Sequence, residues 1–375
     1  MSHDRTRHRR PGVALLMALT LVLVLSTFLS ELFFSTGLEL RAMQTFKSAQ
    51  QARSLAKSAF KALQIGLMGD EAAFMQGYRR IQDLLRVAAL PLENGLLLEL
   101  TVQPLDGLYN LNELAGLRPD SPKNIARWYL FRNIVTAMAI PAETEGGVPG
   151  TVTEAQAAQL YAALFDWMDS DDAEYAEFVG LRGAEADSYF DVQPDYAIKN
   201  ASLDRLSEIT LVRGIRESGI PWEAWKEKFA AIPSGGSDYF PERLNVNVAD
   251  REQIIAYLRT RWIPLDELGE GAGAAIDDQK AINAYANNAE VIAYTLIPEN
   301  EERPVYDQPQ LQEALTLPGL IPRYAGKLFT VVSSYYRIAL TTEVDGISAT
   351  LRAVLHVPRH GGGATGTEVL WFTLN

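Results

Sequence analysis

The chain has 375 residues, an ordinary globular composition, a net charge of −13 at pH 7 and no cysteine. The first twelve residues carry +3, which leaves −16 for the rest, and so acidic a body repels nucleic acids and anionic lipid surfaces. The lack of cysteine excludes disulfides, thiol catalysis and cysteine-ligated zinc, and the length allows two domains or one domain with a large insertion.

An uncharged apolar run follows the basic start of the chain. Residues 13–30 contain no charged side chain, and this length is near the lower limit for a helix that crosses about 30 Å of hydrocarbon. The sequence SELFFSTGLEL, which follows the run, lacks the small-residue cleavage site of a conventional signal peptide. The preceding basic residues predict a cytoplasmic N-terminus and a single membrane pass through residues 13–30, with the bulk of the chain on the other side. A plain signal anchor is the simplest alternative.

The helix is expected to continue well beyond the apolar run. Residues 31–68 contain no proline and are rich in good helix formers. Apolar residues recur there at spacings of three and four and predict one apolar face, made of Leu55, Ala59, Ala62, Leu63 and Leu67. The pattern therefore predicts a single helix over residues 13–68, about 84 Å long.

Strand patterns occur in two groups that are far apart in the chain. LLLELTVQPLDGLYNLNEL predicts a hairpin of two strands, over 96–103 and 108–112, with a turn at Leu105, Asp106 and Gly107. Near the C-terminus, β-branched and aromatic residues predict strands over 328–340, 348–357 and 368–374, with turns at Asp345-Gly346 and at GGGATG. Helical patterns dominate between the two groups. This order predicts an α+β fold in which one antiparallel sheet is interrupted by an inserted α-helical domain.

Acidic residues crowd the segment after a helix expected over residues 153–168. The candidate metal ligands are Asp169, Asp171, Asp172, Glu185 and Asp187. Crowded carboxylates repel one another unless a divalent cation compensates them, and calcium accepts 6 to 8 oxygen ligands. The segment is not an EF-hand, because Glu174 stands where that loop needs glycine. A solvated acidic loop that ends the helix is the alternative.

Nucleic-acid binding and catalysis have little support in the sequence. Residues 203–215 and 311–328 are similar to helix-hairpin-helix units, but the acidic body favours helix packing and contact with protein over binding of nucleic acid. His3 and His8 lie near the N-terminus, and His356 and His360 have no paired acid or nucleophile in view. We therefore expect a non-enzymatic protein, with a signal-anchored periplasmic hydrolase as the alternative.

The N-terminal pattern resembles that of type IV pilins and pseudopilins. It combines a short basic leader that ends in Gly12, an immediate apolar run and a long amphipathic helix. The resemblance implies that a prepilin peptidase cuts between Gly12 and Val13 on the cytoplasmic side and methylates the new N-terminus at Val13. The apolar run would then be kept, first as a bilayer anchor and later within a filament.

The residue at the fifth mature position differs from that of most pilins and pseudopilins and points to one subfamily. Most members carry a glutamate at the fifth mature position, where this chain has Met17. A carboxylate deep in a bilayer costs about 2.5–3.5 kcal/mol, so it is worth keeping only where a neighbouring subunit pairs with it. Met17 and the length of the chain together resemble the K-type minor pseudopilin of the type II secretion system, the subunit held to sit at the tip.

Four local motifs occur in the order found in the K-type family. They are Asn-Leu-Asn at 110–112, Asp-Trp-Met-Asp-Ser-Asp at 166–171, Gly-Ala-Glu-Ala-Asp-Ser-Tyr at 183–189 and Asn-Val-Asn-Val-Ala at 245–249. In the third motif the family has an acid directly after the glutamate, whereas here Asp187 lies one place later. The resemblance implies a pilin-like fold, with a long helix packed on an antiparallel sheet that a large all-α, SAM-like domain interrupts.

The resemblance also implies a division of the chain and a set of partners. The expected parts are a leader (1–12), the transmembrane and amphipathic helix (13–68), the first part of the sheet domain (69–120), the inserted helical domain (121–322) and the C-terminal strands (323–375). The implied role is a non-enzymatic tip subunit that initiates and caps the pseudopilus, anchored in the inner membrane with its bulk in the periplasm. Implied partners are the I-type and J-type minor pseudopilins, prepilin peptidase and the inner-membrane secretion platform, with calcium bound in the helical domain. A minor pilin of a type IV pilus is the alternative.

Overall fold

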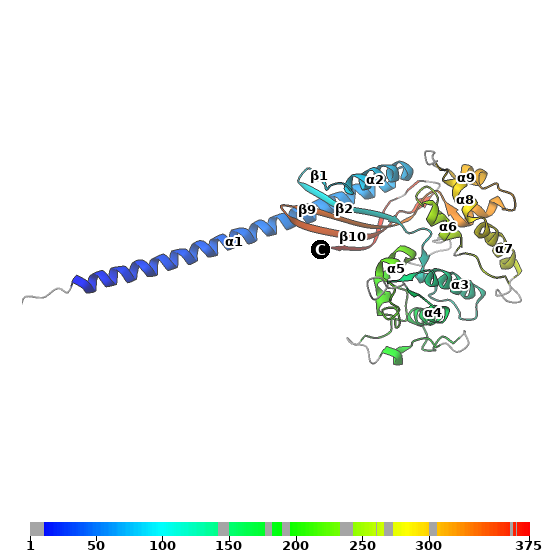
Figure 1. Ribbon diagram of the computed structural model, residues 1–375, viewed down its shortest axis with the longest axis horizontal. Helices are drawn as coiled ribbons and strands as arrows, with labels where there is room; N and C mark the ends of the chain where they lie inside the picture. The colour runs from blue at the N-terminus through cyan, green and yellow to red at the C-terminus, as the bar shows by residue number, and fades with distance from the viewer. Residues whose placement is uncertain are drawn as a thin grey trace, which may run out of the picture.

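The molecule consists of a long helical stalk and a head with three parts (Figure 1). The structure, a computed structural model, describes residues 11–141, 150–176, 182–189, 196–232, 243–259, 261–265, 273–299, 306–360, 363–364 and 366–375. The leader up to residue 10, and part of the GGGATG turn, lie outside the described residues.

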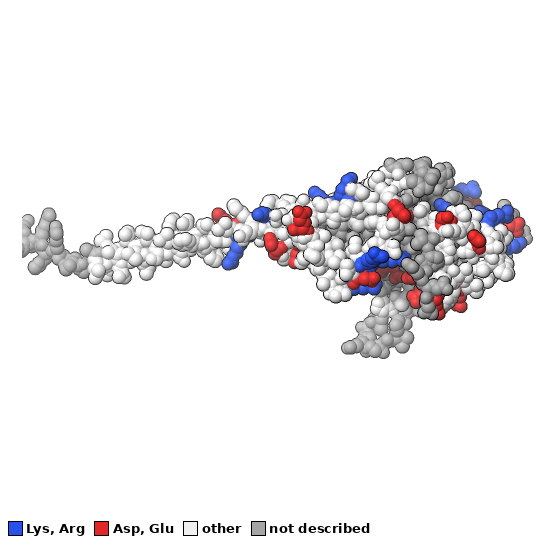
Figure 2. Space-filling model, turned by 90° about the horizontal axis from the view of Figure 1, so that it is seen from above, with Lys and Arg blue, Asp and Glu red and all other residues white. Residues whose placement is uncertain are grey.

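The stalk is the N-terminal part of a single helix, α1 (Pro11–Met68), which confirms the helix expected over 13–68. The large apolar side chains of its first half are exposed as far as Phe46. Charged side chains gather on the head, while the outer stalk carries almost none (Figure 2). The helix is thus apolar on all sides in its outer half and amphipathic only where it joins the head.

The inner half of α1 packs one face on the sheet. Residues buried at this contact recur every three or four positions: Ser48, Ala52, Ala56, Phe60, Leu63, Gln64 and Leu67. The expected face is partly wrong, because Ala62 is exposed and the buried stripe is centred on Ala52, Ala56 and Phe60. The alanines allow close approach of the helix to strands β9 (Tyr335–Val344) and β10 (Ile347–His356), and this approach selects the buried face.

The sheet is antiparallel, with strand order β1-β2-β9-β10-β13. The strands are β1 (Leu90–Leu92), β2 (Gly95–Pro104), β9 (Tyr335–Val344), β10 (Ile347–His356) and β13 (Glu368–Leu374). Buried and less buried residues alternate along β9 and β10, as expected for strands with one face on a core. Helix α2 (Glu71–Leu85) lies beside α1 and contributes Met75 to the same core. The α+β fold and the two last predicted strands are confirmed.

The strand expected over 96–103 is confirmed as β2, but its expected pairing in a hairpin with residues 108–112 is wrong. Strand β2 pairs with β1 and β9, while the chain after its turn leaves the sheet. The carboxylate of Asp106 accepts hydrogen bonds from the N–H groups of Ser334 and Tyr335, so it points back at the start of β9. Gly107 adopts φ 101° and packs directly on Leu244, where a Cβ would lie 2.9 Å from the Leu244 Cα. A turn of this shape directs the chain into the helical region.

The strand expected over 328–340 is wrong in its first part. Residues Ala325–Leu328 form helix α10, Phe329–Thr330 form the short strand β8, and β9 begins at Tyr335. The intervening Ser333 N–H donates to the buried carboxylate of Glu71, at 2.8 and 3.0 Å from its two oxygens. The backbone therefore bonds to side chains here instead of continuing in a sheet.

The inserted region contains two helical modules of similar design. The first module runs from β3 (Tyr109–Asn110) through η1 (Leu111–Glu113), α3 (Pro122–Thr136), β4 (Ala139–Ile140), β5 (Gly150–Thr151), α4 (Glu154–Met168), η2 (Ala186–Tyr189), η3 (Leu206–Leu211) and α5 (Trp222–Lys228) to β6 (Phe229–Ala230). The second runs from β7 (Leu244–Asn245) through α6 (Arg251–Arg259), α7 (Gly273–Asn287), α8 (Ala289–Leu296), α9 (Gln308–Ala314), η5 (Pro322–Tyr324) and α10 (Ala325–Leu328) to β8 (Phe329–Thr330). A small separate pair, β11 (Arg359–His360) and β12 (Gly363–Ala364), follows β10.

Each module is closed by a parallel pair of two-residue strands from its two ends. Strand β3 pairs with β6, and β7 pairs with β8. Each module also begins with Asn-x-Asn and contains a glycine turn at positive φ, Gly214 at 86° and Gly319 at 83°. The two Asn-x-Asn motifs and the two hairpin-like segments are therefore equivalent parts of a repeated unit, although in the sequence they stand as separate features.

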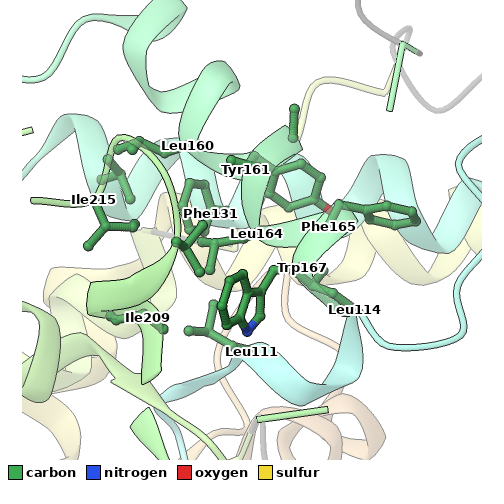
Figure 3. Packing of buried hydrophobic residues seen from close by; sticks show 14 of the residues in the cluster. Leu111, Leu114, Phe131, Leu160, Tyr161, Leu164, Phe165, Trp167, Ile209 and Ile215 are labelled. Carbon is green, nitrogen blue, oxygen red and sulfur yellow. The ribbon is translucent and has the colours of Figure 1, made fainter. Parts of the chain in front are cut away.

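The two modules have separate hydrophobic cores. In the first, helix α4 is buried along most of its length and its Trp167 lies among Leu111, Leu114 and Ile209 (Figure 3). Phe131 of α3 contacts Tyr161 of α4, with ring centroids 5.3 Å apart. The second core gathers side chains from α6 to α10. Helix α4 is thus a rigid support for the residues at its C-terminal end.

Candidate functional site

The stalk presents a continuous apolar surface with no partner among the described residues. Residues Leu15–Met68 form the one helix of the described chain that is long and apolar enough to cross a membrane. The hydroxyl groups of Thr20, Thr27 and Thr36 donate to carbonyl groups of their own helix, so they add no unpaired donor in a lipid environment. This surface suits a bilayer or the helices of neighbouring subunits.

The residues expected to be processed lie at the start of this helix. Gly12 and Val13 are in the first turn of α1, and the side chain of Met17 is 67% exposed on the stalk. Cleavage between Gly12 and Val13, and methylation of Val13, stay predictions.

A second candidate site is a buried group of three carboxylates at the end of α4. Asp166, Asp169 and Glu185 each offer one oxygen, and these oxygens lie within 4.8 Å of one another. Asp166 lies in the last turn of α4, Asp169 caps that helix, and Glu185 arrives from the loop before η2. Asp166 and Glu185 are buried, and Asp169 is largely buried. We refer to them as the acidic centre.

The backbone fixes the position of Asp166. Its Oδ1 accepts a hydrogen bond from the Tyr175 N–H at 2.9 Å, and its Oδ2 accepts one from the Ala184 N–H at 2.6 Å. Gly183 lies so close to this carboxylate that a Cβ at residue 183 would overlap it. The chain therefore approaches Asp166 in a way that only glycine permits at this position.

The other two carboxylates have oxygens without protein partners. Among the described residues, Asp169 Oδ1 and both oxygens of Glu185 are buried and accept no hydrogen bond. They lie at the C-terminal end of α4, where the helix dipole adds partial negative charge. No ion pair to the acidic centre occurs within the described part of the chain. Unpaired buried charge is costly, so this arrangement calls for a cation or for protons.

Burial raises the pKa values in the acidic centre. Burial raises the pKa of Asp166 to about 7, although the two backbone hydrogen bonds to its carboxylate lower it. The negative charge of Glu185 raises it further. Burial also raises the pKa of Asp169 to about 7, helped by the charges of Asp171 and Asp166. The pKa of Glu185 is also raised, first by burial and then by neighbouring acids. Without a cation, the acidic centre therefore holds protons near neutral pH.

The structure brings together part of the expected ligand set. Asp169 and Glu185 lie in the acidic centre, whereas Asp171, Asp172 and Asp187 are exposed and lie outside the group of three. Their role as ligands stays a prediction, and the charges of Asp171 and Asp172 do act on the pKa of Glu185.

Sequence reasoning missed Asp166, a member of the acidic centre, and Asn200, which bonds to the loop after α4. Asp166 was noticed only as part of a motif, although it lies three residues before Asp169 and therefore on the same helix face. Asn200 donates to the carbonyl of Asp171 at 3.4 Å, and its buried Oδ1 accepts no hydrogen bond among the described residues. No signal in the sequence pointed to Asn200.

The acidic centre fits a hard divalent cation better than a catalytic role. Carboxylate oxygens are among the ligands that calcium prefers, and the unpaired oxygens of Asp169 and Glu185 supply them. Bound there, a cation would tie the end of α4 to the loop around residues 182–185. Within the described part of the chain, the acidic centre consists of carboxylates only and does not pair a nucleophilic side chain with a general base.

Comparisons with known proteins find one family model and a solved structure of similar fold. Residues 107–221 match the family model described as type II secretion system (T2SS), protein K. A comparison with curated proteins finds no match. Among solved structures, the chain is similar to one in the crystal structure of the GspK-GspI-GspJ complex from the type 2 secretion system of enterotoxigenic Escherichia coli. The TM-score is 0.53 at 16% sequence identity, and the match covers 90% of this chain and 99% of that chain.

Proposed function

The chain belongs to the family of type II secretion system protein K, and from this membership we propose that it is the minor pseudopilin that initiates the pseudopilus and stays at its tip. The observation that carries the proposal is the exposed apolar stalk of α1, joined to a head that is much wider than the stalk (Figure 1). The stalk would anchor the chain in the inner membrane before assembly. It would then pack among the helices of other subunits.

The stalk supports assembly through close helix contact. Helices in lipid associate by packing, since lipid is as apolar as their own side chains, and small residues allow close approach. The stalk offers Ala14, Ala18, Thr20, Ser26 and Gly37 for this purpose. The solved relative is found in a complex with GspI and GspJ, and we propose subunits of the I and J types as partners of this chain.

Two features support a position at the tip. Met17 provides no carboxylate to neutralise the N-terminus of a subunit above. The two helical modules extend from the end of the sheet that lies away from the stalk (Figure 1), where they would block the addition of another subunit. Extension would then proceed from below. The role is structural, and the pseudopilin family is generally non-enzymatic.

Processing can be tested by co-expression with a prepilin peptidase. We expect the mass of the chain to fall by that of residues 1–12 and to rise by one methyl group, and Gly12→Leu should keep the full mass. An unchanged mass for the natural sequence would contradict the proposal and favour an uncleaved anchor.

The tip position can be tested with labelled filaments and a matched pair of variants. Gold labels on this subunit should lie at one end of each filament; labels along the filament would contradict the proposal. Met17→Glu should assemble less well than the similarly sized Met17→Gln, because an unpaired carboxylate in the bilayer costs about 2.5–3.5 kcal/mol. Equal assembly of both variants would indicate a partner above this subunit.

A further inference from the structure

The two edges of the five-stranded sheet are protected to different degrees. Strand β1 forms one edge and β13 forms the other. Strand β1 has three residues with Pro91 at its centre, and a short edge strand with proline resists pairing with another chain. Strand β13 has seven residues, and after Glu368 it contains neither a charged residue nor a proline. Its edge therefore lacks the usual protection against a further strand.

The outer side of β13 presents backbone groups that could pair with such a strand. Asn375, just after β13, exchanges two backbone hydrogen bonds of 3.1 Å with Thr350 of β10. In an antiparallel pair, residues bonded in this way alternate with residues whose N–H and C=O groups point away from the partner strand. The register therefore directs the backbone groups of Leu374 and Phe372 to the outer edge. No other strand of the described residues pairs with β13 there.

Helix α1 borders this free edge. The ring of Phe60 contacts that of Phe372, with centroids 6.2 Å apart, and Phe372 is still 42% exposed. Leu55 approaches the other side of the sheet, where a Cβ on Gly95 at the start of β2 would lie 3.0 Å from it. One flank of α1 thus faces β2, and the other faces β13.

The flank of α1 on the β13 side is basic. Arg53, Lys57 and Lys61 recur every four residues and are exposed, and we refer to them as the basic stripe. At about 100° per residue, Arg53 lies about 20° and Lys57 about 60° around the helix from Phe60. Within the described part of the chain, none of the three cations has a hydrogen bond or an ion pair. Residues 40–69 contain no acid that could compensate them.

The basic stripe lies too far along α1 to reach lipid headgroups. Arg53 is about 35 Å and Lys61 about 47 Å along the helix from Ser30, where the uncharged run ends. Salt screens exposed charges beyond about 8 Å at physiological ionic strength. The charge of the basic stripe is therefore available to a protein and not to the bilayer.

A second copy of this chain is poorly matched to the same edge. Two β13 strands that pair antiparallel about a two-fold axis place both α1 helices on one face of the joined sheet. The two basic stripes would then flank the same line of contact, where like charges repel. A segment with acidic side chains meets opposite charge there instead.

We propose that the outer edge of β13 binds an extended segment of a partner protein that carries acidic side chains on one face. The segment adds a strand to the sheet through main-chain hydrogen bonds to Phe372 and Leu374. Its acidic side chains alternate with other residues and lie on the α1 face, next to the basic stripe. This contact is additional to the packing of the stalk and does not depend on a position at the tip.

The test uses the full chain in detergent micelles and synthetic peptides titrated by calorimetry. The probe is acetyl-Ser-Val-Glu-Val-Glu-Val-Ser-amide, and its counterpart has Gln in place of both Glu residues. We expect the Glu peptide to bind at least about tenfold more tightly than the Gln peptide, because its charge complements the basic stripe. Equal binding, or no binding of the Glu peptide up to about 1 mM, would overturn the proposal.

Two N-methylated peptides test whether the probe binds as a strand. Residues opposite each other in an antiparallel pair share a face, so the Glu residues are the ones that bond to Phe372 and Leu374. N-methylation of both Glu residues should weaken binding at least about tenfold, because it removes the pairing N–H groups and keeps the charge. N-methylation of the two Val residues that precede them should keep binding. Equal binding of the two methylated peptides would contradict strand addition.

Matched variants of the chain locate the binding. Phe372→Pro removes only an outward N–H and should weaken binding at least about tenfold, whereas Phe372→Val keeps this group and should keep binding. Lys57→Glu combined with Lys61→Glu leaves β13 untouched and should also weaken binding at least about tenfold. Arg80→Glu, at an exposed cation of α2, is the control and should change little. Equal losses in the α1 and α2 variants, or unchanged binding in Phe372→Pro, would sink the assignment.

Other occupants of the edge give different results. A dimer of the chain in sedimentation without peptide, absent in Phe372→Pro, would replace the acidic partner with a second copy. Displacement of the Glu peptide by phosphatidylglycerol mixed into the micelles would assign the basic stripe to lipid. Either result would overturn the proposal.

Discussion

At the scale of single residues, the acidic centre depends on where the backbone passes Asp166. Gly183 lies against the Asp166 carboxylate, and the next N–H group along the chain donates to it. The orientation of Asp166 in turn holds the end of α4 near Glu185. One glycine therefore controls the geometry of a site to which it contributes no ligand.

We expect Gly183→Ala to disturb the acidic centre. The added methyl group overlaps the Asp166 carboxylate, and overpacking of this kind costs about 1–3 kcal/mol. Chemical unfolding should show this loss, and calcium should stabilise the variant less than the natural chain. The control is Gly77→Ala in α2, which has open space at the Cβ and should gain about 0.5–1 kcal/mol. Equal changes in the unfolding free energy of the two variants would argue against the close approach of Gly183 to the Asp166 carboxylate.

The raised pKa values predict how stability depends on pH. Asp166 and Asp169 titrate near 7 in the folded chain and near 4 when unfolded, so the folded state holds more protons between these values. The contribution of Asp166 and Asp169 to the stability of the chelated protein should therefore be full below about pH 4 and be lost as pH rises through about 7.

Calcium should reverse this trend, because it replaces protons in the acidic centre. We expect calcium to raise the Tm more at about pH 8 than at about pH 5, measured by thermal unfolding with and without chelator. Asp169→Asn should reduce the calcium effect at both pH values. A Tm that chelator leaves unchanged at about pH 8 would count against the metal site.

At the scale of elements, each helical module is closed by an asparagine that bonds to distant backbone. Asn112 donates to the carbonyls of Leu203 and Ile232 and accepts from the Leu203 N–H. Asn247 has the same pattern, with donation to the carbonyls of Tyr306 and Val331 and acceptance from the Tyr306 N–H. The two modules are thus closed in the same way: in each, one asparagine side chain connects its own segment to two segments that are distant in the sequence.

We expect Asn112→Ala and Asn247→Ala to destabilise their own modules. Each variant leaves backbone groups without a partner, at about 1–3 kcal/mol for every buried group. Hydrogen exchange should show faster exchange in the first module for Asn112→Ala and in the second for Asn247→Ala. The control, Asn287→Ala, is exposed on α7 and should change stability by less than about 0.5 kcal/mol. Loss of protection across both modules from either variant would show that they unfold as one unit.

The elements also show where sequence reasoning succeeds. Helix α1 and strands β10 and β13 were predicted correctly from local periodicity. Apolar residues recur every three or four positions in such a helix and alternate with polar residues in such strands. The hairpin after β2 was predicted wrongly, since the carboxylate of Asp106 bonds to N–H groups more than two hundred residues away. Strand partners chosen by such distant contacts leave no local pattern.

At the scale of the whole molecule, the stalk and the head present different surfaces. The stalk exposes large apolar side chains, while the head exposes charged residues of both signs (Figure 2). A chain of this kind should contact its neighbours through the stalk and solvent or other proteins through the modules. The lack of natural cysteine makes this division directly testable.

We expect single cysteines on the stalk to cross-link to other pseudopilins in the membrane. Leu19→Cys and Leu23→Cys replace exposed apolar side chains, so their thiols lie on the expected contact surface. Glu217→Cys, on the exposed surface of the first module, is the control and should form few cross-links to other pseudopilins. Cross-linking should be measured on gels, after mild oxidation, from cells in which the other minor pseudopilins also carry single cysteines on their N-terminal helices, so that two thiols form each disulfide. Strong cross-linking from residue 217 alone would place the helical head, and not the stalk, at the interface.

The sequence by itself determined the long apolar N-terminal helix, the α+β class and the acidic character of the segment after α4. These features depend on composition and on spacings within one segment, which local hydrogen bonding and burial enforce. Only the tertiary structure decided that Asp166 joins Asp169 and Glu185, that the two modules repeat one design, and that the basic stripe of α1 borders the free edge of β13. Each of these features depends on contacts between residues that are far apart in the sequence. The packing of the whole fold determines which of these contacts form.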